Sequence, residues 1–403
     1  MRAHRKTAPF VASLITLAVV AAACGGDDDD DATAATAASA DTGAPATTSA
    51  PDVPGTTAAP EPTDAPATTD ATESTDAPST SVGEAAGADA EAALAELVAA
   101  AQAEGECTIY SSQALDNLNN FADAFSATYP GIDVTVVRGT DADSIPRVET
   151  ELATNTAGGD LVVMASTAWV VGHAADYVDP TASPQISGLG DYNAELYVHD
   201  NYFEVGAAVL TFAWNTELVP DGISDMEDLL DPALAGGKLG VIDAAIAPAV
   251  VDFWLWLEEN FGTEFVESLA AQEPRIYPSA LPIGEALVSG EIFATPYAAP
   301  AQLVPAAASG APVEFGISEK GAWGAKYFGF IPRSAAHPAC ATLLADFMVT
   351  AEGQGIVMGV AGTVIPGVEG SLITNDMVRN QDLEATAPGP VAEYMEYWDA
   401  LFR

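Results

Sequence analysis

Short apolar segments alternate with amphipathic ones between residues 107 and 164, and this alternation restricts the chain to few architectures. The segments 107–110, 132–137 and 160–164 are short, apolar and β-prone, as expected for buried strands. Amphipathic helices are predicted between them, one ending at Pro130 and one covering 144–154. Strands that alternate with helices form a parallel sheet with helices on both faces, and ligands bind outside the carboxyl ends of such strands.

The pattern recurs later in the chain, which indicates two α/β units. Segment 238–242 reads as a strand, Pro248 as a first-turn residue of the next helix, and 291–294 as another strand. Two apolar β-rich segments, 206–214 and 327–331, are suited to carrying the chain from one unit to the other and back. We therefore expect an α/β fold of two lobes joined by two crossover segments.

The N-terminal residues predict export. Residues 1–23 have a basic start, an apolar run of about fifteen residues and three alanines before Cys24, which is the pattern of a cleaved signal peptide. With the cysteine directly after small residues, the segment resembles a bacterial lipoprotein signal, in which Cys24 is acylated and anchors the protein to the outer face of the cell membrane. An ordinary secretory signal with an incidental cysteine is the alternative.

The segment that follows, 24–87, consists almost entirely of Asp, Ala, Thr, Ser, Pro and Gly. Such a composition buries too little apolar surface to offset the conformational entropy lost on folding. We expect a disordered, acidic tether, with the run of aspartates at 27–31 acting as a solvated spacer.

Charge and cysteine content limit the possible partners. The chain has 12 basic and 58 acidic residues and a net charge of −46, which argues against nucleic acid and anionic lipid as partners. Beyond Cys24 it holds Cys107 and Cys340 alone, and in an exported protein these two are either a disulfide or buried thiols.

The order of several segments resembles a known family. These segments are ECTIYSS, YPGIDVTVV, GGDLVVMAST, FAWNTELV, LAGGKLGVIDA, GEALVSGEIFATPYAAPA and HPACATLLADFMVTAEGQGIV. In this order and spacing they resemble the extracellular solute-binding proteins of ABC importers, in the group that includes ferric iron, polyamine, thiamine and phosphonate binders.

The resemblance implies a type II periplasmic-binding-protein-like fold, in which each lobe is a mixed, mainly parallel sheet flanked by helices. The solute-binding domain would span 88–403, and its parts are expected as follows: lobe 1 at 88–205 and 332–370, lobe 2 at 216–326, and a C-terminal helical segment at 371–403. This topology places Cys107 and Cys340 in the same lobe. It is compatible with a disulfide between them and with two separate buried thiols. The implied function is capture of a small solute in the interlobe cleft for delivery to the importer's permease, by a monomer without a cofactor.

Candidate ligand-binding residues follow strands where helices begin. We expect hydroxyl, carboxylate and aromatic contacts from Ser111, Ser112, Ser166, Thr167, Asp243 and Tyr297. Helix capping is the alternative role for the serines and Asp243. Three aromatic residues are further candidates for the cleft, with a core position as the alternative for each: Trp169, Trp323 and Tyr327.

Ferric binders of this family commonly use two adjacent tyrosines, whereas Tyr297 is followed by Ala298 and Ala299 here. The loop 111–114 also lacks a histidine or carboxylate, so we predict no metal site and favour an organic or oxyanion solute. A ferric iron-binding member of the family is the alternative. Common catalytic motifs are missing, which predicts that the chain is not an enzyme; an extracellular enzyme, or an adhesin or sensor partner on the same scaffold, is the alternative from another class.

Overall fold

The computed structural model describes the backbone of residues 81–403 and the side chains of residues 90–403. The signal segment, Cys24 and the tether as far as residue 80 lie outside the described residues. Helix α1 (Ser81–Glu104) begins within the segment 24–87 that we expected to be a tether, because this part of the chain is rich in alanine and glutamate, which favour helix. Within residues 81–403, none of the helices combines the length and the apolar character that a membrane crossing requires.

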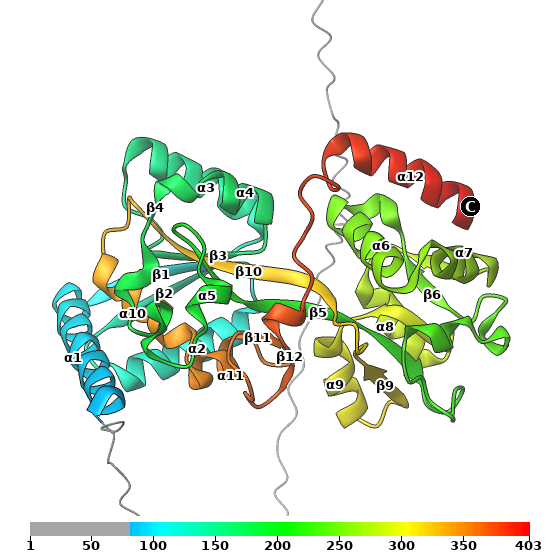
Figure 1. Ribbon diagram of the computed structural model, residues 1–403, viewed down its shortest axis with the longest axis horizontal. Helices are drawn as coiled ribbons and strands as arrows, with labels where there is room; N and C mark the ends of the chain where they lie inside the picture. The colour runs from blue at the N-terminus through cyan, green and yellow to red at the C-terminus, as the bar shows by residue number, and fades with distance from the viewer. Residues whose placement is uncertain (1–80) are drawn as a thin grey trace, which may run out of the picture. The chain divides into compact units, whose positions relative to one another are not determined.

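The predicted alternation of strands and helices is present after α1 (Figure 1). Its elements are β1 (Glu106–Ser111), α2 (Leu115–Thr128), β2 (Asp133–Arg138), α3 (Asp141–Thr154), β3 (Leu161–Met164) and α4 (Thr167–Gly172). A capping box at Thr140 and Asp143 fixes the start of α3. Two short elements, β4 (Tyr177–Val178) and α5 (Ala194–Tyr197), precede the first long strand.

The large sheet is mixed. Its strand order is β12-β11-β5-β10-β3-β1-β2, with β1 parallel to both β2 and β3, and β10 antiparallel to both β3 and β5. The long strands β5 (Phe203–Asn215) and β10 (Trp323–Pro332) extend from one half of the domain into the other, as Figure 1 shows. They contain both predicted crossover segments. The edge strands of this order are β2 and β12 (Ser371–Thr374), and β11 (Ala361–Thr363) lies between β12 and β5.

The second half lies around the far end of β5. Its elements are β6 (Gly240–Ile242), α6 (Pro248–Phe261), α7 (Thr263–Ala271), β7 (Arg275–Tyr277), α8 (Ala280–Ser289), β8 (Ala294–Ala298), α9 (Pro300–Ala308) and β9 (Val313–Gly316). Strands β6 and β7 are parallel, whereas β8 and β9 pair antiparallel with β5. The strand predicted at 291–294 begins only at Ala294, because Gly290 ends α8 in a left-handed conformation and a turn follows.

Two large apolar cores define two lobes. The core of the first lobe packs β1 and β3 against α2 and α10 (Pro338–Met348), with Phe121 and Phe347 in ring contact. The core of the second lobe is built on α6, α7 and α8. Strand β5 contributes Phe203 to the first core and Phe212 to the second, so the crossover strand belongs to both lobes.

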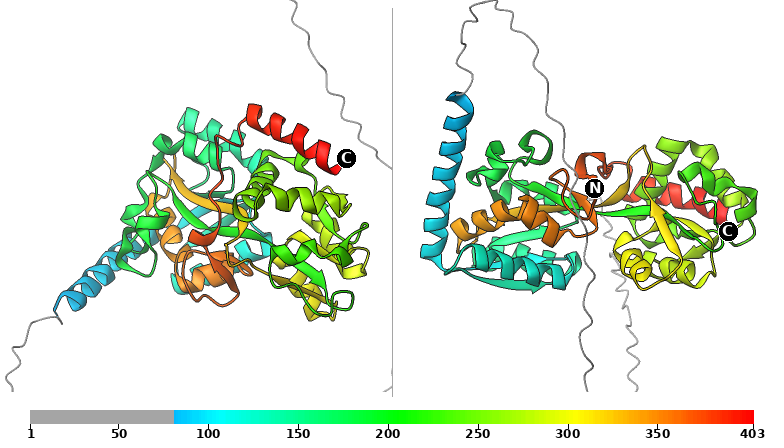
Figure 2. Two further views of the ribbon diagram at one scale, coloured as in Figure 1. Left: turned by 45° about the vertical axis from the view of Figure 1, so that its right-hand side comes forward. Right: turned by 90° about the horizontal axis from the view of Figure 1, so that it is seen from below.

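The C-terminal segment 371–403, expected to be helical, contains β12 before it reaches α12 (Pro388–Phe402). The two views in Figure 2 show α12 beside the helices of the second lobe, and Trp398 contacts Trp254 of α6 with ring centroids 5.7 Å apart. Since β12 lies in the sheet of the first lobe, the chain crosses between the lobes a third time. We call the connecting residues 375–387 the C-terminal strap.

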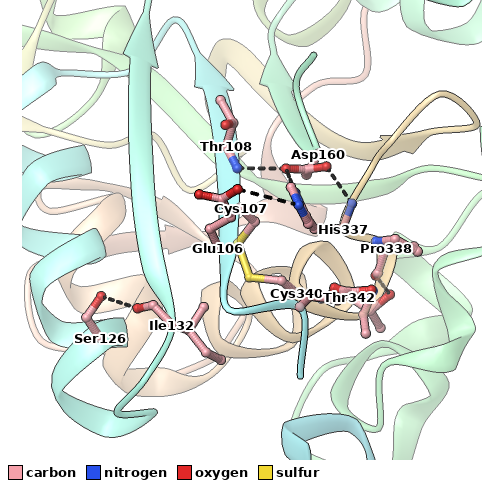
Figure 3. Close-up of a disulfide and its surroundings, with 12 residues drawn as sticks. Glu106, Cys107, Thr108, Ser126, Ile132, Asp160, His337, Pro338, Cys340 and Thr342 are labelled. Carbon is pink, nitrogen blue, oxygen red and sulfur yellow. Dashed lines mark hydrogen bonds and ion pairs between the residues drawn. A yellow bond between two sulfur atoms is a disulfide. The ribbon is translucent and has the colours of Figure 1, made fainter. Parts of the chain in front are cut away.

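A disulfide joins Cys107 of β1 to Cys340 of α10, with Cα atoms 6.0 Å apart and 233 residues between them in sequence (Figure 3). The groups around it fix the same two elements. Glu104 accepts a hydrogen bond from the Cys340 backbone N–H, which caps α10, and Asp160 accepts bonds from the backbone N–H groups of Thr108 and His337. The start of the sheet is thus tied to α10 covalently and by two carboxylates, of which Asp160 is buried. Helix α11 (Ala351–Val357) follows α10.

Candidate functional site

A cavity of about 230 Å³ lies between the two lobes. The first lobe contributes Ala165, Thr167 and Val171, and the second contributes Ala249 and Asp252 of α6. The remaining wall consists of residues before and in β5, residues of β10 and the C-terminal strap: His199, Tyr202, Glu204, Trp323, Gly324, Ala325, Lys326, Phe328, Arg379, Asn380, Gln381 and Leu383. Both lobes, both crossover strands and the third connection therefore meet at one cavity.

One buried ion pair forms part of the cavity wall. Lys326 and Glu204 are 6 % and 3 % exposed, and their Nζ and Oε2 atoms are 3.0 Å apart. Glu204 also accepts a hydrogen bond from the Asn375 side chain and contacts His199 Nε2 through Oε1 at 3.1 Å. Lys326 donates a second bond to Asn380 Oδ1 at 2.6 Å. These partners offset the cost of burying both charges.

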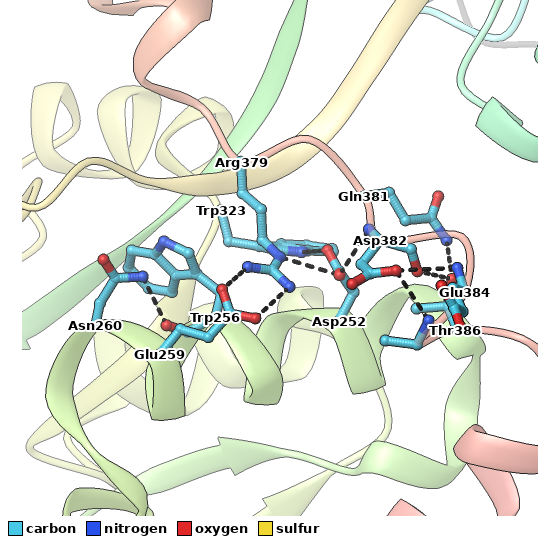
Figure 4. A network of polar contacts seen from close by, with 11 residues as sticks. Asp252, Trp256, Glu259, Asn260, Trp323, Arg379, Gln381, Asp382, Glu384 and Thr386 are labelled. Atoms are coloured by element: carbon cyan, nitrogen blue, oxygen red, sulfur yellow. Dashed lines mark hydrogen bonds and ion pairs between the residues drawn. The ribbon is translucent and has the colours of Figure 1, made fainter.

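A second network surrounds Asp252, which is 1 % exposed (Figure 4). Its Oδ2 atom accepts a hydrogen bond from Trp323 Nε1 at 2.9 Å, and its Oδ1 atom accepts one from Arg379 Nε at 3.0 Å. The Asp382 backbone N–H donates to the same Oδ1. Arg379 places its remaining nitrogens on the carboxylate of Glu259, and the adjacent carboxylates raise its pKa against the opposing effect of burial. The network fixes the strap to α6 and orients the Trp323 indole.

A smaller cavity of about 180 Å³ lies on the other face of β10. It is lined by Gln113, Ala114, Asn117, Ala208, Val209, Leu210, Ala299, Ala301, Tyr327, Val357, Met358, Val360 and Ala361. Lys326 lines the first cavity, and its neighbour Tyr327, next to a bulge in β10, lines this one. Burial raises the pKa of Tyr327. Like the first cavity, this smaller one is lined by residues of both lobes.

Some of the predicted ligand-binding residues line one of the two cavities, and others do not. Thr167 and Trp323 line the larger cavity, and Tyr327 lines the smaller one. Ser111 is buried, where its hydroxyl donates to Gln113 Oε1 and accepts from the Gln113 backbone N–H. Ser112 and Ser166 are half-buried and line neither cavity; Ser166 stands at the N-cap position of α4 without a side-chain cap bond.

Tyr297 lies within β8, in the sheet and not in the loop after it as expected, because the run 294–298 is apolar and fully buried. Its ring contacts Phe253 and Trp323, with centroids 4.8 and 6.0 Å away. Burial raises the pKa of its hydroxyl to about 12. Tyr297 therefore supports Trp323 from behind the cavity wall.

Asp243 and Trp169 are engaged away from both cavities. Asp243 accepts a hydrogen bond from the Ala245 backbone N–H and pairs with Arg403 at the C-terminus. Trp169 stacks on His173 at 4.3 Å and donates its Nε1–H to Glu149. The structure thus gives Asp243 the capping role that was its alternative.

Four charged cavity residues were not predicted from the sequence: Glu204, Asp252, Lys326 and Arg379. A signal for two of them was present. Asp252 interrupts the apolar helix 248–257 and Lys326 interrupts the apolar strand 322–331, and a charged residue in a buried pattern requires a partner. Their partners were not identifiable, because Arg379 follows Asp252 by 127 residues and Lys326 follows Glu204 by 122.

Among residues 90–403 the structure holds no group of three or more His, Cys, Asp or Glu side chains arranged to bind a metal ion.

A two-lobed α/β domain with a cavity between its lobes is the architecture of extracellular solute-binding proteins. Residues 107–359, more than half of the chain, match the family model for bacterial extracellular solute-binding proteins, and the chain belongs to this family. No curated protein matches the sequence closely enough to count as a relative.

Solved structures of low sequence identity share the fold. A putative extracellular solute-binding protein from Bordetella parapertussis is 14 % identical with a TM-score of 0.62, covering 75 % of this chain and 100 % of its own. A Trichodesmium protein in complex with iron and citrate is 17 % identical with a TM-score of 0.56, covering 74 % of this chain and 99 % of its own. The substrate-binding protein of an Agrobacterium tumefaciens ABC transporter is 15 % identical with a TM-score of 0.54, covering 74 % and 94 %.

Proposed function

We propose that this protein captures a small solute in the larger interlobe cavity and delivers it to the permease of an ABC importer. The observation that carries the proposal is the cavity itself, whose wall combines Thr167 and Val171 of the first lobe with Asp252 of the second. A solute that contacts both lobes stabilises their closed arrangement, and a permease can recognise that arrangement. Capture of this kind requires no chemistry on the solute.

We assign contacts with the solute to Thr167 and Trp323. Both were predicted from the sequence, and both line the cavity. Ser112, Ser166 and Tyr327 are secondary candidates for contacts made when the lobes close. Tyr297 acts indirectly, by supporting the indole ring of Trp323.

We further propose that Cys24 carries a lipid anchor and that 24–80 tethers the domain outside the cell membrane. The basis is the sequence: small residues directly before the cysteine and a segment after it that is too polar to fold. Two acyl chains give stable membrane association where one is marginal. The anchor would keep the domain near its permease.

The proposal is tested by solute binding without turnover. The protein is purified, its bound small molecules are released by unfolding and identified by mass spectrometry, and the refolded protein is titrated with each of them. We expect one solute to bind with a stoichiometry of one and to raise the melting temperature, since a ligand that binds only the folded state stabilises it. Conversion of that solute by the protein would identify an enzyme, and the lack of any binding solute would refute the proposal.

Ferric iron is included as a separate arm of this test, because the Trichodesmium structure contains iron and citrate. In the present chain Tyr297 is buried among Phe253 and Trp323 and is followed by two alanines. Its raised pKa also opposes the phenolate form that ferric ion requires. We therefore expect ferric citrate to leave the melting temperature unchanged.

A further inference from the structure

Every acidic and every permanently basic side chain that lines the larger cavity already has a partner within the protein. Glu204 is paired with Lys326, and Asp252 is paired with Arg379. The cavity wall thus contains two negative and two positive groups, and the two pairs leave no net charge facing a solute. His199 and Tyr202 are the other titratable groups of the wall. The His199 ring contacts Glu204, and burial raises the pKa of the Tyr202 hydroxyl, which keeps it neutral.

Each of the two carboxylates also has three hydrogen-bonding partners within the protein. The Glu204 carboxylate interacts with Lys326, Asn375 and His199. The Asp252 carboxylate accepts from Trp323, Arg379 and the Asp382 backbone, as Figure 4 shows. A charged solute could use one of these groups only by separating an existing pair, which would leave the other member buried without a counter-charge. That exchange is unfavourable in a site from which water is excluded.

Uncharged groups make up the rest of the wall. Alanine, valine, leucine and phenylalanine side chains and the Gly324 backbone form its apolar part, and Trp323 adds an indole whose nitrogen is directed to Asp252. Hydroxyls of Thr167 and Tyr202 and the side-chain amides of Asn380 and Gln381 supply neutral polar contacts. Such a wall suits an apolar face together with a few hydroxyl, carbonyl or amide groups.

From these contacts we infer that the solute is an uncharged small molecule with an apolar face that packs against Trp323. This inference rests on the proposed function and specifies its solute class. The strap contributes to this selectivity from a segment outside the family match at 107–359. Its Arg379 pairs with Asp252, and its Asn380 accepts a hydrogen bond from Lys326. The strap therefore distinguishes this site from one built only of family-matched residues.

The test uses the refolded protein and sets of similar probes that carry a neutral, an anionic or a cationic group. One set is benzyl alcohol, benzoate and benzylamine, and the other is glucose, glucuronate and glucosamine. Both sets belong to a library with equal numbers of neutral, anionic and cationic molecules. Melting temperatures and titration calorimetry give the ranking. We expect the best binders to be neutral and at least about tenfold tighter than their charged counterparts, because no free counter-charge is present for the latter. Their affinity should stay constant between about 20 and about 500 mM NaCl, since screening does not affect a neutral solute.

Two variants sharpen the result. Lys326→Met leaves Glu204 without its ammonium partner and is expected to shift the preference toward cations such as benzylamine. The double variant Glu204→Gln with Lys326→Met removes both charges and is expected to restore the neutral preference. If neither variant folds, the library ranking on the unmodified protein decides alone.

The outcomes separate this inference from the proposed function. A tight anionic or cationic solute, or an affinity that falls as salt rises, overturns the uncharged class while leaving solute capture intact. Failure of every probe, and of every molecule released from the purified protein, counts against both.

Discussion

Asp252 accepts the indole N–H of Trp323 through one carboxylate oxygen and the guanidinium of Arg379 through the other, and so joins α6, β10 and the C-terminal strap. Removal of this carboxylate would leave a buried N–H donor and weaken the attachment of Arg379. We expect Asp252→Ala to lower the free energy of unfolding by about 2–4 kcal/mol, as is typical when a buried charge loses its partner. Urea denaturation at neutral pH measures this loss.

The matched control is Glu259, the other carboxylate bound to Arg379, whose side chain is 55 % exposed. Glu259→Ala should cost less than about 1 kcal/mol, because exposed ion pairs contribute little in water. Equal losses in the two variants would show that the Asp252 network does not have the stabilising role assigned to it.

Trp323 is expected to be the main aromatic contact of the solute. Trp323→Ala should weaken binding of the solute recovered from the purified protein by about tenfold or more, because aromatic side chains often dominate binding energy. Isothermal titration gives the affinity. Trp169→Ala is the comparison, since Trp169 packs on His173 outside both cavities, and it should leave the affinity unchanged. If both variants bind equally well, Trp323 is not a contact residue.

The disulfide between Cys107 and Cys340 should contribute strongly to stability, because it closes a very long loop. In the chain-entropy description such a loop is worth about 4–5 kcal/mol. We expect a reductant to shift the urea midpoint of the unmodified domain downward. The doubly substituted Cys107→Ala, Cys340→Ala domain should unfold at the lowered midpoint with or without reductant, and a reductant effect in that variant would point to another cause.

Asp346 predicts a pH dependence of stability. Its carboxylate is 2 % exposed, and its Oδ1 atom accepts hydrogen bonds from Ser183 Oγ and from the Gln185 backbone N–H, both at 2.8 Å. Burial raises its pKa above the ordinary 3.8, and the two hydrogen bonds offset this only in part. The folded state then holds the proton more tightly than the unfolded state does. The stabilising contribution of this group to the free energy of unfolding is therefore complete below pH 3.8 and is lost as the pH rises through the raised pKa.

Asp346→Asn keeps an oxygen that can accept both hydrogen bonds and removes the charge. The variant should therefore gain free energy of unfolding relative to the unmodified protein at pH 7, and this difference should shrink as the pH falls toward 3.8. Asp143→Asn should show the opposite trend, because hydrogen bonds from Thr140 lower the pKa of Asp143. Urea denaturation across this range compares the two, and parallel trends would contradict the assignment.

Cys24 is expected to determine where the protein is found. Cys24→Ala should move the mature protein from the membrane fraction to the soluble extracytoplasmic fraction, because the acyl chains are lost. Fractionation with immunodetection measures the distribution. A variant that stays wholly in the membrane fraction would contradict lipid anchoring at this residue.

Local pattern was sufficient for most of the element order and for part of the site. The period of apolar residues identified the strands β1, β2 and β3 and the helices α2 and α6, and the rule that ligands bind beyond strand ends led to Thr167. These features depend on neighbours within about four residues along the chain, so the sequence shows them directly. The strand predicted at 291–294 was placed three residues too early, because the prediction did not weigh the left-handed turn at Gly290.

The tertiary structure decided which distant residues meet. Cys107 lies against Cys340, Glu204 against Lys326, and Asp252 against Arg379, each pair more than a hundred residues apart in sequence. No local period encodes such pairs, since they follow from how β10 and the strap pack between the lobes. The same packing decided that Tyr297 is a buried support for Trp323 and that the charges of the cavity neutralise one another. Burial makes these contacts strong, and burial is a property of the folded chain, because it depends on every element that covers a residue.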